Sequence, residues 1–244
     1  MPLNKASIYF YMLSGDYKFA DKTVEVNSIY EMVHTYCKEY ATCEPSDFSV
    51  LTTEEDIDYE INRAEIRTYP RGYYEELAVY RKICEKMPFY YTFLFHCSVI
   101  AVDGEAYAFA APSGTGKSTH ARLWREYLGE RAVMVNDDKP LLHIGDVVTA
   151  YGTPYDGKHH LSNRIAVPLK AVCIVERGEN NQIEKINPNE AFPVLVQQTY
   201  RPLDVAALGK TMELLDKLME KVSFYRLHCN MDIEAARVSY EGMK

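Results

Sequence analysis

The sequence predicts an α/β fold built on a mixed β-sheet, and three features of the pattern support this. An apolar run at 106–111 leads into a loop rich in Ser, Gly and Thr, and a helical pattern begins at Lys117. Other apolar runs are separated only by short turn sequences, as in hairpins. Only one helix joins two strands directly, unlike the strict strand–helix alternation of a parallel α/β fold. A sheet with a parallel and an antiparallel part accounts for all three.

The first 90 residues predict an α+β portion. We expect strands at 7–13 and 48–52, and helices at 27–41, 53–66 and 71–87. Thr52 and Glu55 have the spacing of a capping box for the second of these helices. The many tyrosines of this portion favour half-buried packing over a dedicated recognition surface. The sequence pattern changes near residue 90, where predicted strands begin to dominate. This change divides the chain into an N-terminal portion at 1–90 and a core at 91–244.

Strands dominate the pattern after residue 91. A long strand at 92–102 is expected to turn at Asp103-Gly104 into the strand that precedes the loop. Capping residues predict helices that begin after Asn187, Asp204 and Asp232. Further strands are expected at 132–135, 141–144, 147–151, 167–175 and 224–227.

Composition and charge narrow the class of protein. With 244 residues, 47% hydrophobic and 25% charged, the chain has the make-up of a soluble globular protein. Its net charge of −8 argues against a nucleic-acid or membrane-surface binder, and no apolar run is long enough to span a membrane. The six cysteines are widely spaced, without a Cys-x-x-Cys pair, which favours reduced thiols in the cytoplasm. The sequence leaves a homo-oligomer open.

Residues 111–119 predict a phosphate-binding loop. Glycines at 114 and 116 allow backbone N–H groups to turn toward an anion, and the following helix directs its N-terminus at the same anion. Lys117 would reach the β- and γ-phosphates, and the Ser118 hydroxyl would ligate Mg²⁺. Alanine at 111 replaces the usual first glycine, which fits if its φ is negative. The expected nucleotide-binding residues are Ser113, Gly114, Thr115, Gly116, Lys117, Ser118 and Thr119.

Asp137 and Asp138 follow an apolar strand about twenty residues beyond Lys117. One carboxylate would bind Mg²⁺ and the other would accept a proton from the acceptor hydroxyl. Both are catalytic candidates and Asp138 is also a candidate metal ligand, but the sequence does not decide which of them is the base. An Asn-Asp-Asp sequence is also ordinary turn chemistry. Lys158, in a Gly/Pro/His loop at 152–161, and Arg201 are candidates for contacting an anionic substrate.

Taken in order, these motifs resemble the HPr kinase/phosphorylase-type P-loop kinases, which are related in fold to phosphoenolpyruvate carboxykinase. The resemblance covers about residues 90–180 and rests on His96, the loop at 111–118, the Asp pair and Arg177-Gly178. It implies ATP with Mg²⁺, a catalytic aspartate, and a histidine near the phosphates; His96, otherwise an apolar-strand residue, becomes a catalytic candidate. The substrate loop typical of that family is absent at 163–170, which argues against HPr as acceptor.

We therefore expect a kinase that transfers the γ-phosphoryl group of ATP to a hydroxyl of a small molecule or of a peptide Ser or Thr. The alternatives are a nucleotide-binding sensor without transfer activity and an enzyme like phosphoenolpyruvate carboxykinase. The acceptor, the oligomeric state and the role of the N-terminal portion stay open.

Overall fold

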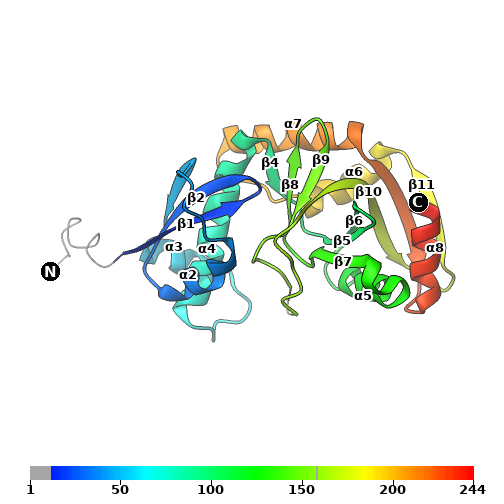
Figure 1. Ribbon diagram of the computed structural model, residues 1–244, viewed down its shortest axis with the longest axis horizontal. Coiled ribbons are helices and arrows are strands. Elements are labelled where there is room, and N and C mark those ends of the chain that lie inside the picture. The colour runs from blue at the N-terminus through cyan, green and yellow to red at the C-terminus, as the bar shows by residue number, and fades with distance from the viewer. Residues whose placement is uncertain (1–11, 158) are drawn as a thin grey trace. The chain divides into compact units, whose positions relative to one another are not determined.

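The computed structural model describes residues 12–157 and 159–244. By its internal contacts the chain divides into two compact units, one ending at Lys86 and the other beginning at Met87 (Figure 1). The strand expected at 7–13 lies almost wholly outside the described residues.

The first unit contains a three-stranded sheet in the order β1-β2-β3. β1 (Leu13–Phe19) and β2 (Lys22–Ser28) form an antiparallel hairpin, whose turn residues Ala20 and Asp21 have φ of 47° and 61°. Residues 14–16 lie within β1 and pair with β2. β3 (Phe48–Leu51) confirms the second expected strand and runs parallel to β2.

The helices of this unit are α2 (Glu31–Cys37), α3 (Glu54–Arg63) and α4 (Arg71–Lys86). The capping box of α3 lies one residue later than expected, at Thr53 and Asp56. The Thr52 hydroxyl instead donates to Glu75 Oε1 at 2.6 Å, and the Thr52 N–H donates to the Asn27 carbonyl at 3.1 Å. The buried Glu75 carboxylate also accepts the backbone N–H groups of Ile29 and Tyr30 at 2.7 and 2.8 Å, just before α2 begins.

The second unit is built on a nine-stranded mixed sheet that curls between helices (Figure 1). Its main path runs β4-β8-β9-β10-β6-β5-β7, and β12 joins β10 to β11. β10 is parallel to both β6 and β12, whereas the other neighbouring pairs are antiparallel. The strands are β4 (Thr92–Leu94), β5 (Ser98–Val102), β6 (Glu105–Ala110), β7 (Ala132–Asn136), β8 (Leu141–Ile144), β9 (Val148–Tyr151), β10 (Ala166–Arg177), β11 (Gln182–Ile186) and β12 (Ser223–Cys229).

The single long strand expected at 92–102 is interrupted. β4 pairs with β8, and β5 pairs with β6 and β7. Between them, Phe95 bridges to Thr199 and the His96 N–H donates to the Gln198 carbonyl at 2.8 Å. The chain therefore changes partners at Phe95 and His96, which sets His96 outside both flanking strands.

Helices cover both faces of this sheet, and the strand β6 shows how. Its residues Ala106, Ala108 and Ala110 belong to the core beneath α6 (Pro188–Gln198) and α7 (Val205–Lys221). Tyr107 and Phe109 face the core beneath α5 (Lys117–Leu128) and α8 (Ile233–Met243). Period-two alternation buried on both sides is the arrangement of a central strand. The second unit is thus a layered, mixed α/β structure.

Side-chain caps explain where the C-terminal helices begin. Asn187 and Glu190 form the expected capping box of α6, and Asp204 accepts the Ala207 N–H at the start of α7. Asp232 occupies the N-cap position of α8, but makes no side-chain capping bond. Its carboxylate accepts a hydrogen bond from Asn230 instead.

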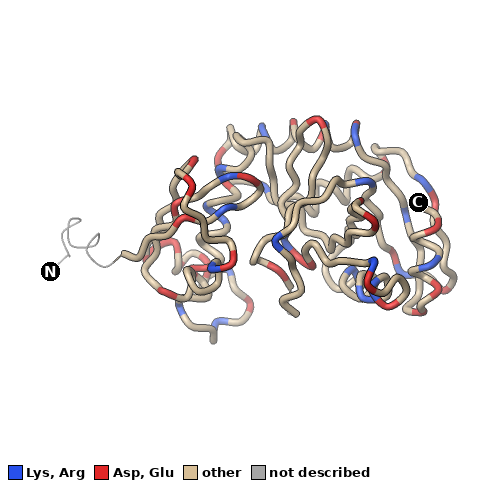
Figure 2. The backbone as a smooth tube through the Cα atoms, viewed as in Figure 1, with Lys and Arg blue, Asp and Glu red and all other residues tan. Residues whose placement is uncertain are grey.

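Acidic and basic residues are interspersed along the backbone of both units (Figure 2). All six cysteines are free thiols. Within the described part of the chain, no helix has both the length and the hydropathy that crossing a membrane requires.

His120, on α5, predicts an acid-sensitive core. Its Nε2 lies 2.9 Å from Ser239 Oγ, whereas its buried Nδ1 has no hydrogen-bond partner among the described residues. Burial lowers the pKa of His120 from 6.5 to about 4. Between pH 6.5 and about 4, the unfolded chain therefore binds a proton at His120 that the folded chain does not bind. The free energy of unfolding falls as the pH falls through this range, by on the order of 3 kcal/mol.

The prediction is checked by urea unfolding of the wild type and of His120→Gln between pH 7.5 and about 4.5. The variant removes the titrating ring, so its free energy of unfolding should fall less steeply with acid than that of the wild type. Equal slopes for the two proteins would contradict the assignment.

Candidate functional site

Residues 111–116, here called the glycine loop, connect β6 to α5. Gly114 and Gly116 have φ of 76° and 127°, a backbone conformation that side chains with a Cβ rarely adopt. Ala111 is buried and is not among the residues with positive φ, so alanine is accommodated in place of the usual glycine. Gly116 is the N-cap of α5 and brings no side chain to cap the first turn. The helix therefore begins with backbone N–H groups that a ligand can accept from.

Lys117 is the first residue of α5 and is largely buried. Its ammonium group donates to the Ala111 carbonyl at 2.8 Å, so its side chain folds back over the glycine loop. Burial lowers the pKa of Lys117, and the charges of Asp138 and Asp137 act in the opposite direction. A partly desolvated ammonium in this position attracts an anion more strongly than one on the open surface.

The Asp pair stands in a turn shaped by Asn136. The Asn136 Oδ1 accepts the N–H groups of Asp138 and Lys139 at 2.9 and 2.7 Å. Its Nδ2 donates to the backbone carbonyl of Thr153 at 3.1 Å, which joins the turn to the segment after β9. The Asn-Asp-Asp sequence thus forms a hydrogen-bonded turn, and this turn carries the carboxylates of both Asp137 and Asp138.

Asp137 is connected to β5, the strand next to β6. Its Oδ1 accepts the Ser98 hydroxyl at 2.8 Å. Burial raises the pKa of Asp137 although the hydroxyls of Ser98 and Ser118 act in the opposite direction, and the neighbouring charge of Asp138 adds to the increase. Gly157 packs against the other oxygen, because a Cβ at 157 would lie 3.4 Å from Asp137 Oδ2.

Asp138 is held by charged and polar groups. Its Oδ1 lies 2.6 Å from His96 Nε2, and its Oδ2 lies 3.2 Å from the Lys139 ammonium. Burial would raise the pKa of Asp138, but the His96 hydrogen bond and the Lys139 charge outweigh it and keep this pKa below its usual value. His96 Nδ1 in turn lies 3.1 Å from Gln198 Oε1. Both ring nitrogens of His96 are therefore engaged, and the ring orients Asp138.

Arg177, the last residue of β10, braces the glycine loop. Its Nη2 donates to the Gly114 carbonyl at 2.6 Å, and its Nε donates to the Thr115 carbonyl at 3.4 Å. In a trans peptide the C=O and N–H point in opposite directions. Fixing these two carbonyls therefore also fixes the direction of the N–H groups of Thr115 and Gly116.

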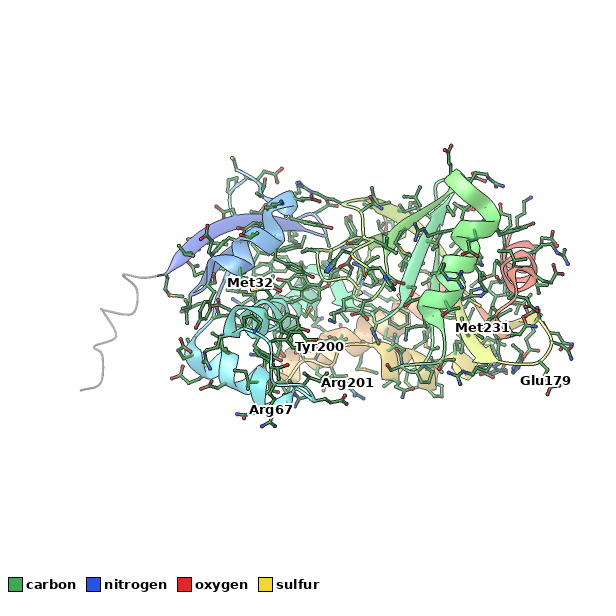
Figure 3. The ribbon with its side chains drawn as sticks, turned by 90° about the horizontal axis from the view of Figure 1, so that it is seen from below. Met32, Arg67, Glu179, Tyr200, Arg201 and Met231 are labelled. Carbon is green, nitrogen blue, oxygen red and sulfur yellow. The ribbon has the colours of Figure 1, made fainter. Side chains whose placement is uncertain are left out.

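The two candidate substrate residues are not brought to the site by any described contact. Lys158 lies outside the described residues, although its neighbour Gly157 contacts Asp137. Arg201 is exposed in the segment after α6, next to Tyr200 (Figure 3). Gln198, the last residue of α6, does contact the site through His96.

Sequence reasoning did not assign roles to Ser98, Gln198 and Arg177. Ser98 lies two residues after His96, a spacing that places alternate strand residues on one side and that could have drawn attention to it. For Gln198 and Arg177, no local sequence pattern indicates a contact with His96 or with the glycine loop.

Comparisons with known proteins give a family and a weak structural likeness. A search of curated proteins finds no match. Among solved structures, the chain is similar to the Hpr(Ser) kinase/phosphatase from Coxiella burnetii, with a TM-score of 0.34 and 7% sequence identity over 61% of this chain and 94% of that one. The family model "SynChlorMet cassette protein ScmC" matches residues 76–231, which is more than half of the chain. The matching family is thus not HPr kinase itself: the chain belongs to the ScmC family of SynChlorMet cassette proteins.

Proposed function

We propose that the chain is an ATP- and Mg²⁺-dependent kinase that transfers the γ-phosphoryl group to a hydroxyl of a small molecule or of a peptide Ser or Thr. The observation that carries the proposal is the pairing of β5 with both β6 and β7: Ser98 pairs with Phe109 just before the glycine loop, and its hydroxyl donates to Asp137 at 2.8 Å. It connects the glycine loop with the Asp pair, and so brings the expected phosphate cradle and the expected acid–base group into one site.

The glycine loop and Lys117 would hold the phosphates. Backbone N–H groups at the start of α5 suit the β-phosphate, and the ammonium of Lys117 suits the γ-phosphate. In the structure this ammonium is satisfied by the Ala111 carbonyl, a neutral acceptor that an anion can replace. The loop therefore needs no large rearrangement to accept its ligand.

The residues present fit a magnesium ion held jointly with a nucleotide. Among the described residues, no group of three or more His, Cys, Asp or Glu side chains could hold a metal by itself. Mg²⁺ commonly takes only one or two carboxylates and completes its shell with phosphate oxygens and water. The Ser118 hydroxyl and Asp138 would hold it, and the ion would neutralise the charge on the transferring group.

The surroundings of the two aspartates support a division of roles. Asp138 stays ionised because His96 and Lys139 hold its charge, which suits a metal ligand. Asp137 has the raised pKa and an oxygen beside Gly157 in the loop expected to meet the substrate, which suits the proton acceptor. His96 would orient Asp138, and Gln198 would in turn orient the His96 ring.

Transfer of label from [γ-³²P]ATP to a panel of small hydroxyl compounds and Ser/Thr peptides tests the proposal directly. Labelled product from the wild type, absent without Mg²⁺, is the expected result. Tight nucleotide binding without transfer to any acceptor would instead favour a sensor. Nucleotide-dependent decarboxylation or carboxylation would favour the carboxykinase alternative.

Arg177→Gln is expected to weaken ATP binding about tenfold, because the carbonyls of Gly114 and Thr115 lose the donor that fixes their peptide planes. Arg177→Lys should recover only part of the loss, since one ammonium cannot reproduce the guanidinium fork. Titration calorimetry measures both. Arg237→Gln, on the exposed face of α8, is the control, and unchanged affinity in Arg177→Gln would contradict the bracing role.

A further inference from the structure

A cavity of about 590 Å³ opens beside the glycine loop. Its walls come from the loop, from the end of β10 and from α6, and its lining residues are Pro112, Ser113, Gly114, Thr115, Ile174, Val175, Glu176, Arg177 and Val194. Neither the Asp pair nor His96 contributes to this lining. Its size lies within the range of about 300–1,000 Å³ that is usual for pockets of small molecules.

The strand order separates this cavity from the Asp pair. β6, which leads into the glycine loop, has β10 on one side and β5 on the other. The cavity takes its lining from β10, whereas the Asp pair follows β7 on the far side of β5. A ligand that fills the cavity therefore approaches the glycine loop from the side opposite to Asp137 and Asp138.

We propose that this cavity holds the base and ribose of the nucleotide, so that the phosphate chain crosses the glycine loop with its γ end toward Asp137. The inference rests on the proposed function and adds the direction of the bound nucleotide. The acceptor hydroxyl has to meet the γ-phosphoryl group on the Asp137 side, which leaves the β10 side for the nucleoside.

The chemistry of the walls suits a nucleoside. Val194, which is half-buried on α6, gives an aliphatic wall against which the flat face of a base can pack, whereas Ile174 and Val175 are almost wholly buried at the end of β10. Ser113, Thr115 and Glu176 add hydroxyls and a carboxylate that can bind ribose hydroxyls or ring nitrogens. Arg177 lines the cavity and also holds the loop carbonyls, so the nucleoside and phosphate parts of the site share one side chain.

A test compares Mg-ATP with Mg-tripolyphosphate, which carries the phosphate chain without a nucleoside. Val194→Trp places a large ring in the cavity and is expected to weaken ATP binding at least about tenfold while leaving tripolyphosphate affinity unchanged. Val196→Trp, two residues further along α6 and outside the lining, is the matched control and should change neither affinity. Calorimetry on the full chain measures both ligands.

Each result separates the hypotheses. Equal losses for both ligands, or no loss for ATP, would overturn the nucleoside assignment while leaving the kinase proposal intact. A loss of transfer with unchanged ATP affinity would make the cavity an acceptor site and also overturn it. If the wild type binds neither ligand, the proposed function itself fails. Should circular dichroism show Val194→Trp to be unfolded, Val194→Phe provides the same comparison with a smaller ring.

Discussion

Asp137→Asn is expected to reduce phosphoryl transfer by about a hundredfold or more while ATP binding stays close to that of the wild type. The amide preserves the shape of the side chain and can still accept the Ser98 hydroxyl, which donates to Asp137 at 2.8 Å. It cannot take a proton from the acceptor. Because the loss concerns a step after binding, it should appear in turnover and not in the dissociation constant.

Asp138→Asn provides the contrast. It removes the charge that His96 and Lys139 surround, and we expect weaker retention of Mg-ATP together with slower transfer. Single-turnover transfer and calorimetric binding, measured side by side, separate the two variants. Asp146→Asn, in the exposed turn between β8 and β9, is the control. Wild-type transfer rates in both site variants would reduce the Asp pair to a structural turn.

Lys117→Ala is expected to weaken ATP binding by about a hundredfold, because the variant loses a partly buried ammonium that would pair with phosphate oxygens. The fold should survive, since the ammonium makes one hydrogen bond to the Ala111 carbonyl and lies at the edge of the core. Calorimetric titration measures the affinity. Lys210→Ala, an exposed lysine of α7 paired with Glu213, controls for a general loss of positive charge. Unchanged ATP affinity would refute the phosphate-loop assignment.

Local sequence was enough to locate the centre of the candidate site. The strand before the glycine loop, the two glycines and the helix that begins at Lys117 are all specified within fifteen residues, and the structure has them as expected. The position of Asp137 and Asp138 at the end of β7 is equally local. Helix starts at Asn187 and Asp204 were also predictable, because a capping side chain acts over only two or three residues.

Contacts between distant segments could not be predicted in the same way. The break at Phe95 and His96 depends on hydrogen bonds to residues 198 and 199, which no pattern near residue 95 reveals. The capping box lies at Thr53 and Asp56, while Thr52 contacts Glu75 on another helix, which no pattern near residue 52 reveals. β11 was missed because its side chains are mostly polar or exposed, and it becomes a strand by pairing with β12.

The contact between His96 and Gln198 has a consequence for the order in which the site is assembled. These residues are separated by 102 positions, and β10 obtains its parallel neighbour β12 only when residues 223–229 are present. During synthesis, the glycine loop and the Asp pair therefore leave the ribosome long before the segment that orients Asp138. Contacts of this sequence separation are costly in loop entropy and form late. A nascent chain that ends before Gln198 would carry the glycine loop and the Asp pair without the contact that holds His96 beside Asp138.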